Sequence, residues 1–394
     1  MKKFSTVIIG GGASGIVAAI SAKRKGKDVL ICEKTAKLGK KISISGSGRC
    51  NLSNDDLSER HYNPSARKLV KSVFSKFGGE DIKNFFRGLG LVTYSEGGRI
   101  FPITNQSASV LAVLEKEMKR LGVSVEFNFA ASEIVNSKQG LLIKSKDNKR
   151  VLCDSAVITG GGMTYPVTGS DGASYGLARQ LGHSIIEPVP SAVALVVKDR
   201  FCHFLQGQKI FAGVKAIIDG NPAGEASGEL LFTRYGLSGT VILDISREVS
   251  VEINRRGGKQ ADIIVDMAPF MDLDALREEF RKNTRNGAAK EDLIVGILPN
   301  KFSLALKEAF GGFDVNSLAD RLKSKRFRVI GTRGWNEAEF TAGGVNLSEV
   351  NCETLESRLK KGVYFAGEVL DVDGERGGYN LAWAWASGFL AGVG

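Results

Sequence analysis

The sequence is poor in the residues that build disulfide frameworks and metal sites. It has only five cysteines, no two of them in CxxC spacing, and only three histidines. These counts argue against a disulfide framework, a zinc site and a His-rich metal site, so we expect no metal. No run of about 18 apolar residues is present, so we expect no membrane span and a cytoplasmic protein with reduced thiols.

Glycine, by contrast, is abundant, with 48 of 394 residues. That fraction is well above the roughly 7% typical of proteins and indicates many tight turns or backbone packed against a ligand. Glycines also interrupt the apolar stretch after Lys3, which otherwise imitates a signal peptide. Hydrophobic and charged contents of 43% and 25% are those of a globular protein, and the length predicts two or three domains.

Negative charge is scarce in the first third of the chain. Residues 1–130 contain 22 Lys and Arg against 11 Asp and Glu, whereas residues 131–394 contain 32 of each. Part of this positive excess is expected to bind an anion. The remainder is either an ordinary solvated face or a surface for a polyanion, and comprises Arg67, Lys68, Lys71, Lys76, Lys83 and Arg87.

The chain opens with a strand–helix–strand pattern. The β-branched run 6–9, the helical pattern over 14–25 and the apolar run 29–32 predict a βαβ unit, and hence an α/β fold with a parallel sheet. The continuation predicts helices over 65–77, 79–89 and 105–121, and strands over 123–127, 141–145 and 151–158.

The character of the sequence changes after Pro188. The next elements predicted are strands at 192–197, 209–218, 229–233 and 241–245, then helices near 272–285, 300–310 and 315–324, and a strand at 327–330. Residues 362–394 again predict a strand, a glycine turn and an apolar helix. The simplest layout is a discontinuous α/β domain over 1–190 and 336–394, a β-rich domain over 191–245 and 326–335, and a helical insert over 246–325.

A glycine motif joins the first strand to the first helix. Gly10, Gly12 and Gly15 stand in GxGxxG spacing, and Glu33 closes the next strand. In such a turn the first glycine permits the tight bend, the second lets the backbone approach a pyrophosphate, and the third lets helix and strand pack closely. The acid accepts hydrogen bonds from the adenosine ribose. This Rossmann-like pattern predicts a bound dinucleotide, and the acid favours FAD or NAD over NADP.

Two later segments favour FAD. Val157–Gly162 resembles the ATGG element of flavoproteins with two dinucleotide-binding domains, and Val363–Glu368 resembles their second strand-plus-acid element, whose acid contacts the ribityl and phosphate side of FAD. The sequence has no second strand-linked GxGxxG, so NAD(P)H, if used, is expected to dock only transiently as an electron donor.

Two further glycine segments suit the flavin end of the cofactor. Lys40 and Lys41 precede Ser45–Asn51, whose small residues allow close backbone approach while the cations neutralise phosphate; a plain basic loop is the alternative. Near the C-terminus, Gly377 and Gly378 begin a helix. Its N-terminus is expected to face the flavin pyrimidine, the alternative being an ordinary helix start.

Four spaced motifs resemble one known family. They are Gly39–Asn54, Gly161–Ser170, Leu230–Gly239, and Gly367–Gly374 with Gly377–Asn380. Together they resemble the aminoacetone-oxidase-type FAD-binding flavoproteins, a bacterial family of NAD(P)/FAD-dependent oxidoreductases, over residues 4–394. The resemblance implies non-covalent FAD and three domains: a discontinuous Rossmann-like FAD-binding domain, a small inserted β-barrel and a helical subdomain. The activities it implies are diverse, namely oxidation of an amino ketone, reduction of a steroid-like enone, and reduction of a uridine in ribosomal RNA.

This chain departs from the family pattern at two positions. Arg234 stands where the family usually has His after LLFT, and Thr240 stands where it usually has Pro. If position 234 lies near the flavin, the change replaces a neutral proton carrier by a fixed cation. No spacing commits a residue to acid–base catalysis, and the candidates are Tyr165, Cys50, Tyr379 and Arg234.

Motifs and resemblance together give the expected cofactor contacts. We expect FAD to be held by Gly10, Gly12, Ala13, Ser14, Gly15, Glu33, Lys34, Lys40, Lys41, Ser45, Gly46, Gly48, Arg49, Cys50, Asn51, Thr159, Gly160, Gly161, Gly367, Glu368, Asp371, Gly377, Gly378, Tyr379, Asn380 and Leu381.

Three functions remain open at this point. The first is an NAD(P)H-driven flavin reductase of a C=C bond, acting on a small enone or on uridine in ribosomal RNA. The second is a flavin oxidase of a small amino ketone that produces hydrogen peroxide. The third is a non-catalytic, flavin-bound protein associated with RNA. The expected partner is therefore a small-molecule substrate or ribosomal RNA.

Overall fold

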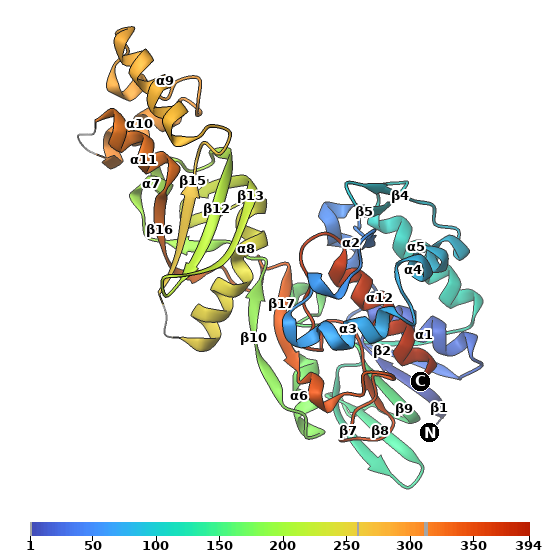
Figure 1. Cartoon of the computed structure of the whole chain (residues 1–394). Coiled ribbons are helices and arrows are strands. Elements are labelled where there is room, and N and C mark those ends of the chain that lie inside the picture. Colours follow the sequence, from blue (N-terminus) through green and yellow to red (C-terminus); the bar gives the residue numbers. More distant parts are fainter. Residues whose placement is uncertain (1, 258–259, 311–313) are drawn as a thin grey trace. The chain divides into compact units, whose positions relative to one another are not determined.

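The computed structural model describes residues 2–257, 260–310 and 314–394 (Figure 1). It divides into two compact units, residues 1–188 with 340–394, and residues 189–339. The chain leaves the first unit through β10 (Ile185–Ser191) and returns to it through β17 (Phe340–Val345). The first unit is therefore assembled from both ends of the sequence.

A seven-stranded sheet forms the centre of the first unit. Its order is β6-β2-β1-β9-β8-β7, and β18 also pairs with β9. The pairs β2–β6, β1–β2, β1–β9 and β9–β18 are parallel, whereas β7, β8 and β9 form an antiparallel meander. The strands are β1 (Lys3–Ile9), β2 (Val29–Glu33), β6 (Ser124–Phe127), β7 (Ala131–Ser137), β8 (Gly140–Ser145), β9 (Arg150–Ile158) and β18 (Val363–Phe365).

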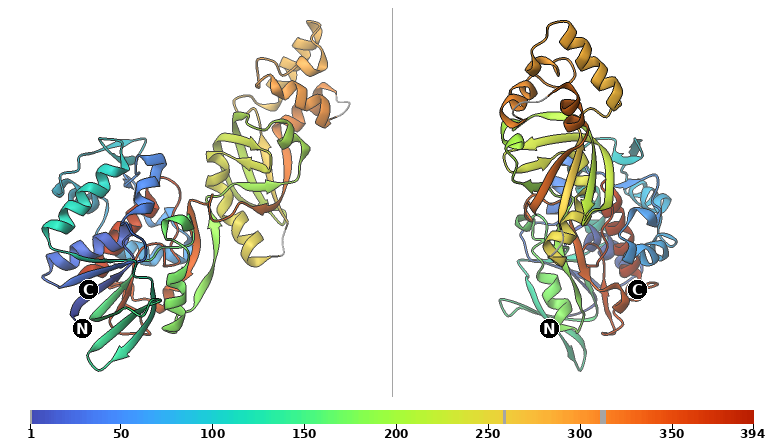
Figure 2. Two further views of the ribbon diagram at one scale, coloured as in Figure 1. Left: turned by 180° about the vertical axis from the view of Figure 1, so that it is seen from behind. Right: turned by 60° about the vertical axis from the view of Figure 1, so that its left-hand side comes forward.

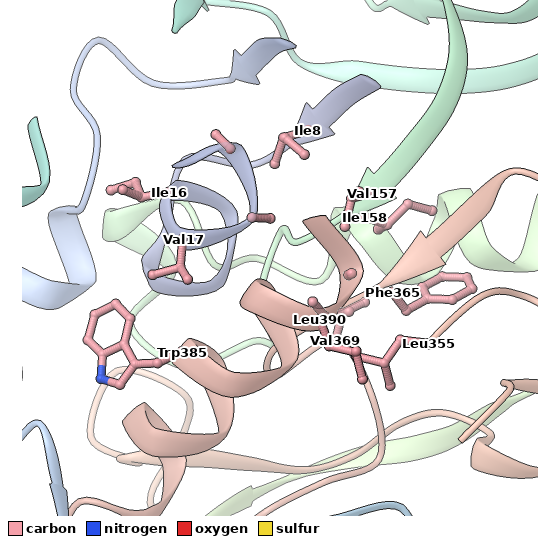
Figure 3. Close-up of a cluster of buried hydrophobic side chains, with 14 of the residues drawn as sticks. Ile8, Ile16, Val17, Val157, Ile158, Leu355, Phe365, Val369, Trp385 and Leu390 are labelled. Atoms are coloured by element: carbon pink, nitrogen blue, oxygen red, sulfur yellow. The ribbon is translucent and has the colours of Figure 1, made fainter. Parts of the chain in front are cut away.

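Two glycines bring the first and last helices into close contact. Helix α12 (Tyr379–Val393) packs along α1 (Ala13–Arg24), and a Cβ at Gly388 or Gly392 would lie 2.3 Å from the carbonyl oxygen of Ser14 or Ala18. Figure 3 shows the apolar cluster around this contact, with Ile16 of α1 and Trp385 of α12. This packing joins the C-terminal segment to the glycine turn at the start of the chain.

Shorter elements complete the first unit. Helices α3, α4 and α5 lie close to their predicted positions, whereas α2, α6 and a small sheet of order β3-β5-β4 were not predicted. These elements are α2 (Lys40–Ile44), β3 (Ser53–Asn54), α3 (Arg67–Phe74), α4 (Gly79–Gly88), β4 (Thr93–Glu96), β5 (Arg99–Pro102), α5 (Ser107–Arg120) and α6 (Ala173–Gln180).

The second unit is a closed barrel with helices at its ends (Figure 2). The strand order is β11-β14-β13-β12-β15-β16. Phe201, Phe232, Phe302 and Phe327 are fully buried and pack against one another in its core. The elements are β11 (Leu195–Val197), α7 (Arg200–Phe204), β12 (Lys209–Ile218), β13 (Asn221–Thr233), β14 (Gly236–Ser238), α8 (Thr240–Val251), β15 (Ala261–Asp266), α9 (Leu273–Arg285), α10 (Lys301–Phe310), α11 (Val315–Lys323) and β16 (Lys325–Thr332).

The predicted fold class is confirmed, because a Rossmann-like α/β unit accompanies a closed β-barrel and helical elements. One predicted strand, 241–245, is wrong. These residues open α8, where Val241, Ile242, Ile245 and Val249 recur at helical spacing and are buried. The range 246–325 is also not wholly helical, because it contains barrel strand β15. No helix in the described part of the chain is long and apolar enough to cross a membrane.

Candidate functional site

The turn between β1 and α1 needs glycine at two positions and leaves a third one open. Gly10 has φ of +109°, and a Cβ there would lie 2.8 Å from the Thr159 carbonyl oxygen. A Cβ at Gly15 would lie 1.9 Å from the carbonyl oxygen of Gly10, whereas a Cβ at Gly12 would meet nothing within 4 Å. Gly10 and Gly15 serve packing, whereas Gly12 leaves open space beside the N-terminus of α1, as a phosphate-binding turn requires.

Glu33 is fixed beside this turn. Its side chain is buried, and its two carboxylate oxygens accept hydrogen bonds from the backbone N–H groups of Gly11 (2.8 Å) and Thr35 (2.7 Å). Each oxygen keeps a further lone pair, which suits the hydroxyls of a ribose. The neighbouring Lys34 points elsewhere, because its ammonium pairs with Asp171 at 2.5 Å.

The second glycine segment, residues 160–162, follows β9 at the same sheet edge. The Thr159 hydroxyl donates to the Gly10 carbonyl at 2.7 Å, which ties this segment to the first turn. A Cβ at Gly160 would lie 1.9 Å from the Ser174 hydroxyl oxygen, and a Cβ at Gly161 would lie 2.8 Å from that of Ser170. Glycine is needed here because the segment that leads into α6 packs directly against the backbone.

Lys41 and Glu368 meet across 327 residues of sequence. The Lys41 ammonium lies 2.6 Å from one Glu368 oxygen and donates to the Thr164 hydroxyl at 2.5 Å. The other Glu368 oxygen accepts from the Thr341 N–H at 2.9 Å. At this half-buried site the cation can bind phosphate oxygens, and the carboxylate can bind sugar hydroxyls. Lys40 lies outside this cluster and donates to the Val167 carbonyl at 2.9 Å.

The side chain of Arg49 is turned toward the β4–β5 hairpin. Its guanidinium contacts Glu96 (2.7 Å), the Tyr94 hydroxyl (2.8 Å) and Asn105 (2.9 Å), and lies 4.1 Å from the centre of the Phe101 ring. These contacts hold the guanidinium at the hairpin and anchor the segment 45–51. The segment therefore presents mainly its backbone, with Gly46, Ser47, Gly48 and Cys50 all at positive φ.

Cys50 is held as a neutral thiol. It is fully buried, and burial raises the pKa of the thiol to about 12. A thiol this basic is neither a nucleophile nor a metal ligand near neutral pH.

The start of α12 lies against the segment 51–53. Gly377 and Gly378 have φ of +137° and +102°, and a Cβ at Gly378 would lie 2.2 Å from the Ser53 carbonyl oxygen. Asn380 fixes the preceding loop, because its amide accepts from the Gly374 N–H at 2.9 Å and donates to the Gly374 carbonyl at 2.8 Å. The free N–H groups of the helix start, through Leu381, form a positive pole beside these glycines.

Tyr379, the first residue of α12, stacks on a histidine that the sequence pattern did not reveal. The rings of His61 and Tyr379 lie 4.5 Å apart. His61 Nδ1 lies 2.8 Å from Glu375 and Nε2 lies 3.1 Å from Asp56. Burial, with the nearby carboxylates of Glu375 and Asp56, raises the pKa of the Tyr379 phenol. Because His61 and Glu375 are 314 residues apart, no local pattern could have linked them.

The other predicted site residues are distributed over both units. Tyr165 has φ of +52° and precedes a short turn in the first unit. Asp371 accepts from the Ser65 hydroxyl at 3.3 Å, and its carbonyl accepts from Asn63 at 3.0 Å. Arg234 is exposed in the turn between β13 and β14 of the second unit.

Three buried polar atoms beside these segments have no hydrogen-bond partner: Asn51 Oδ1, Ser170 Oγ and the Tyr175 hydroxyl. An orphaned buried donor or acceptor costs about 1–3 kcal/mol, so such atoms indicate a polar ligand. Open space at Gly12, a carboxylate with spare lone pairs at Glu33, a cation beside a carboxylate and a helix N-terminus match the parts of FAD. The residues present therefore fit FAD.

Comparison with known proteins identifies the family. The family model described as HI0933-like protein Rossmann domain matches residues 4–394. The chain belongs to this family. It is 37% identical over 402 residues to the 3-dehydro-bile acid delta(4,6)-reductase of Clostridium scindens, covering 98% of this chain and 97% of that protein.

A more distant relative is the ribosomal RNA dihydrouridine synthase of Haemophilus influenzae. It is 28% identical over 411 residues, and the match covers 99% of this chain and 98% of that protein. A solved 3-ketosteroid delta1-dehydrogenase from Sterolibacterium denitrificans is similar in fold, with a TM-score of 0.51, 13% identity, and 100% and 99% of the two chains covered. The predicted Rossmann-type FAD-binding family is confirmed, and the protein is an FAD-dependent oxidoreductase.

Proposed function

We propose that this protein reduces a C=C bond conjugated to a carbonyl group in a small molecule, with NAD(P)H as the electron donor. The supporting observation is the 37% identity to a delta(4,6)-reductase along nearly the full length of both chains. The dihydrouridine named for the 28% relatives is uridine with one C=C bond reduced, so both named reactions share this chemistry. The higher identity favours the small-molecule substrate.

The residues described above would hold FAD in a defined order. Open backbone at Gly12 and the N-terminus of α1 would bind the pyrophosphate, and Glu33 would bind the adenosine ribose. The positive pole at the start of α12 would stabilise negative charge on the flavin pyrimidine. When bound, FAD supplies the hydride for the reaction.

Reduction of a C=C bond also needs one proton. Tyr379 is the first candidate to hold it, because a phenol is protonated at neutral pH and can donate that proton. It also begins the helix whose N-terminus is assigned to the flavin. Cys50 is a poorer candidate, because no basic partner accompanies its buried thiol.

A uridine in ribosomal RNA is the second candidate substrate. The named relatives and the positive charge of residues 1–130 favour it. Ion pairs neutralise part of the positive charge of that region. Lys76 pairs with Glu353, and Lys83 pairs with Glu80 and Asp55. A surface that binds RNA through many phosphates needs unpaired cations.

An anaerobic titration with NADH and NADPH tests the donor. We expect the visible flavin spectrum to bleach rapidly with one of them. A flavin that stays oxidised with both would contradict the proposal and favour oxidation of a small amine, with hydrogen peroxide as the product to be measured.

The reduced enzyme is then mixed with each acceptor separately. A 4-en-3-one steroid should reoxidise it, whereas unmodified ribosomal RNA should not; the reverse result would establish the RNA substrate. Tyr379→Phe should slow this second half-reaction about 10²-fold and leave the first unchanged. Tyr165→Phe, the variant of the competing phenol candidate, should leave both half-reactions unchanged. Equal slowing of both half-reactions would remove Tyr379 from the proton step.

A further inference from the structure

A short segment leading into α6 packs beneath the second glycine segment. The Gly172 N–H donates to the Gly162 carbonyl at 3.0 Å, which fixes the two segments to each other. A Cβ at Gly172 would lie 3.0 Å from the Met163 side chain and 3.4 Å from the Tyr175 ring. The ring of Tyr175 therefore lies close to Gly172, which is itself bonded to the second glycine segment.

The Tyr175 hydroxyl is a buried donor without a partner. Tyr175 is 2% exposed, and its hydroxyl makes no hydrogen bond. Burial raises the pKa of the phenol well above its usual range, and the carboxylates of Glu368 and Asp371 raise it further, so the group keeps its proton. Ser170, 6% exposed and also without a partner, faces Gly161 on the same side.

The strand order shows which part of FAD these hydroxyls meet. Neighbouring parallel strands run β2, β1, β9, β18, and their carboxyl ends share one sheet edge. Glu33 ends β2, the turn with Gly10 and Gly12 follows β1, and Gly160 and Glu368 follow β9 and β18. A dinucleotide laid along this edge with its adenosine at β2 and its pyrophosphate at β1 places the next part of the molecule at β9 and β18. In FAD, that part is the ribityl chain.

We infer that the Tyr175 hydroxyl, with Ser170 beside it, is a hydrogen-bond donor for the ribityl chain of FAD. Ribityl hydroxyls accept and donate, so they match a phenol donor that lies near two carboxylates. Tyr175 lies outside the motifs and Ser170 ends one of them, and both would act through side chains where the glycines act through backbone. The inference concerns binding of FAD alone and does not depend on the acceptor of the electrons.

The test compares the full-length apoprotein with the FAD-bound protein in Tyr175→Phe. Removing an orphan hydroxyl should leave the melting temperature of the apoprotein unchanged or raise it. The dissociation constant for FAD, from fluorescence titration, should rise about five- to tenfold. The constant for ADP should not change, because ADP has no ribityl chain. Ser170→Ala should give the same pattern with a smaller change.

Ser21→Ala is the matched control, because Ser21 is another buried hydroxyl without a partner, two turns along α1 from the glycine motif. It should leave FAD affinity unchanged. A Tyr175→Phe apoprotein that loses stability while FAD affinity is unchanged would show a purely structural hydroxyl and overturn the inference. Equal weakening of FAD and ADP would also overturn it. If Tyr175→Phe does not fold, the Ser170→Ala titrations decide by the same criteria.

Discussion

The two units of the molecule differ in where their buried polar atoms without partners lie. In the barrel, Asp262 is almost fully buried and is paired with Arg326, Arg328 and Gln260. In the first unit, Asn51, Ser170 and Tyr175 carry buried polar atoms without partners, all beside glycine segments. The second unit pairs the carboxylate of Asp262 from its own chain, and the unpartnered atoms of its described part, Arg277 Nε and Ser303 Oγ, lie in its helices α9 and α10. In the first unit, three such atoms lie together at the proposed cofactor site. Binding of FAD should therefore stabilise the two units unequally.

The largest expected effect separates core packing from cofactor binding. Phe232→Ala removes a fully buried ring that packs against Phe201, Phe302 and Phe327. It should lower the free energy of unfolding of the barrel by about 3–5 kcal/mol. Chemical denaturation followed by circular dichroism measures this loss, and FAD affinity at a temperature where the variant is folded should stay unchanged. A parallel loss of FAD affinity would show that the comparison is wrong.

Two further variants separate a glycine needed for packing from a glycine beside the proposed ligand. Gly15→Ala places a Cβ 1.9 Å from the Gly10 carbonyl and should destabilise the apoprotein by about 2–4 kcal/mol. Gly12→Ala meets nothing within 4 Å and should leave apoprotein stability nearly unchanged while FAD affinity falls at least tenfold. Differential scanning fluorimetry and FAD titration measure the two effects. Similar behaviour of the two variants would argue against a ligand beside Gly12.

A third variant tests the ribose-binding acid. In Glu33→Gln, one amide N–H₂ group must face the N–H of Gly11 or Thr35, which now donate to the carboxylate. FAD and ADP affinities should fall together, by about tenfold or more, because adenosine is common to both. This result would be the counterpart of Tyr175→Phe, for which only FAD should weaken. Unchanged ADP affinity would remove Glu33 from the adenosine site.

The smallest expected effect is a pH dependence of the first unit. Burial lowers the pKa of His183, whose ring contacts Ser357 at 2.7 Å and Glu349 at 3.1 Å. A folded-state pKa below the unfolded value gives stability that is present above about pH 6.5 and is lost as pH falls through that range. The melting temperature should drop by a few degrees between pH 7.5 and 5.5, and His183→Gln should flatten this slope. A slope that is unchanged in the variant would assign the effect to other groups.

The parts of the site that could be predicted from the sequence are those whose residues lie close together along the chain. The turn with Gly10, Gly12 and Gly15, and the acid Glu33 after the next strand, lie within one βαβ unit, so spacing alone located them. Lys41 with Glu368, and His61 with Glu375, meet across more than 300 residues, and only the folded chain brings them together. Tyr175 belongs to no motif. Its burial could not be predicted, because it arises only when α6 packs under the second glycine segment.

The wrong strand at 241–245 has a different cause. A run of five residues with four apolar side chains fits a buried strand and a buried helix turn equally well. The spacing that decides the matter extends to Val249, beyond the run itself. Barrel strand β15 was not predicted, because it lies between two segments whose sequence pattern is helical.

The contact of Gly388 and Gly392 in α12 with Ser14 and Ala18 in α1 has a consequence for biosynthesis. The ribosome releases α1 first and α12 only after the whole barrel unit has been made. The barrel can fold while the chain is still being synthesised, but α1 must wait with its apolar face uncovered until α12 arrives. We therefore expect FAD to bind only after translation, when α12 has packed on α1.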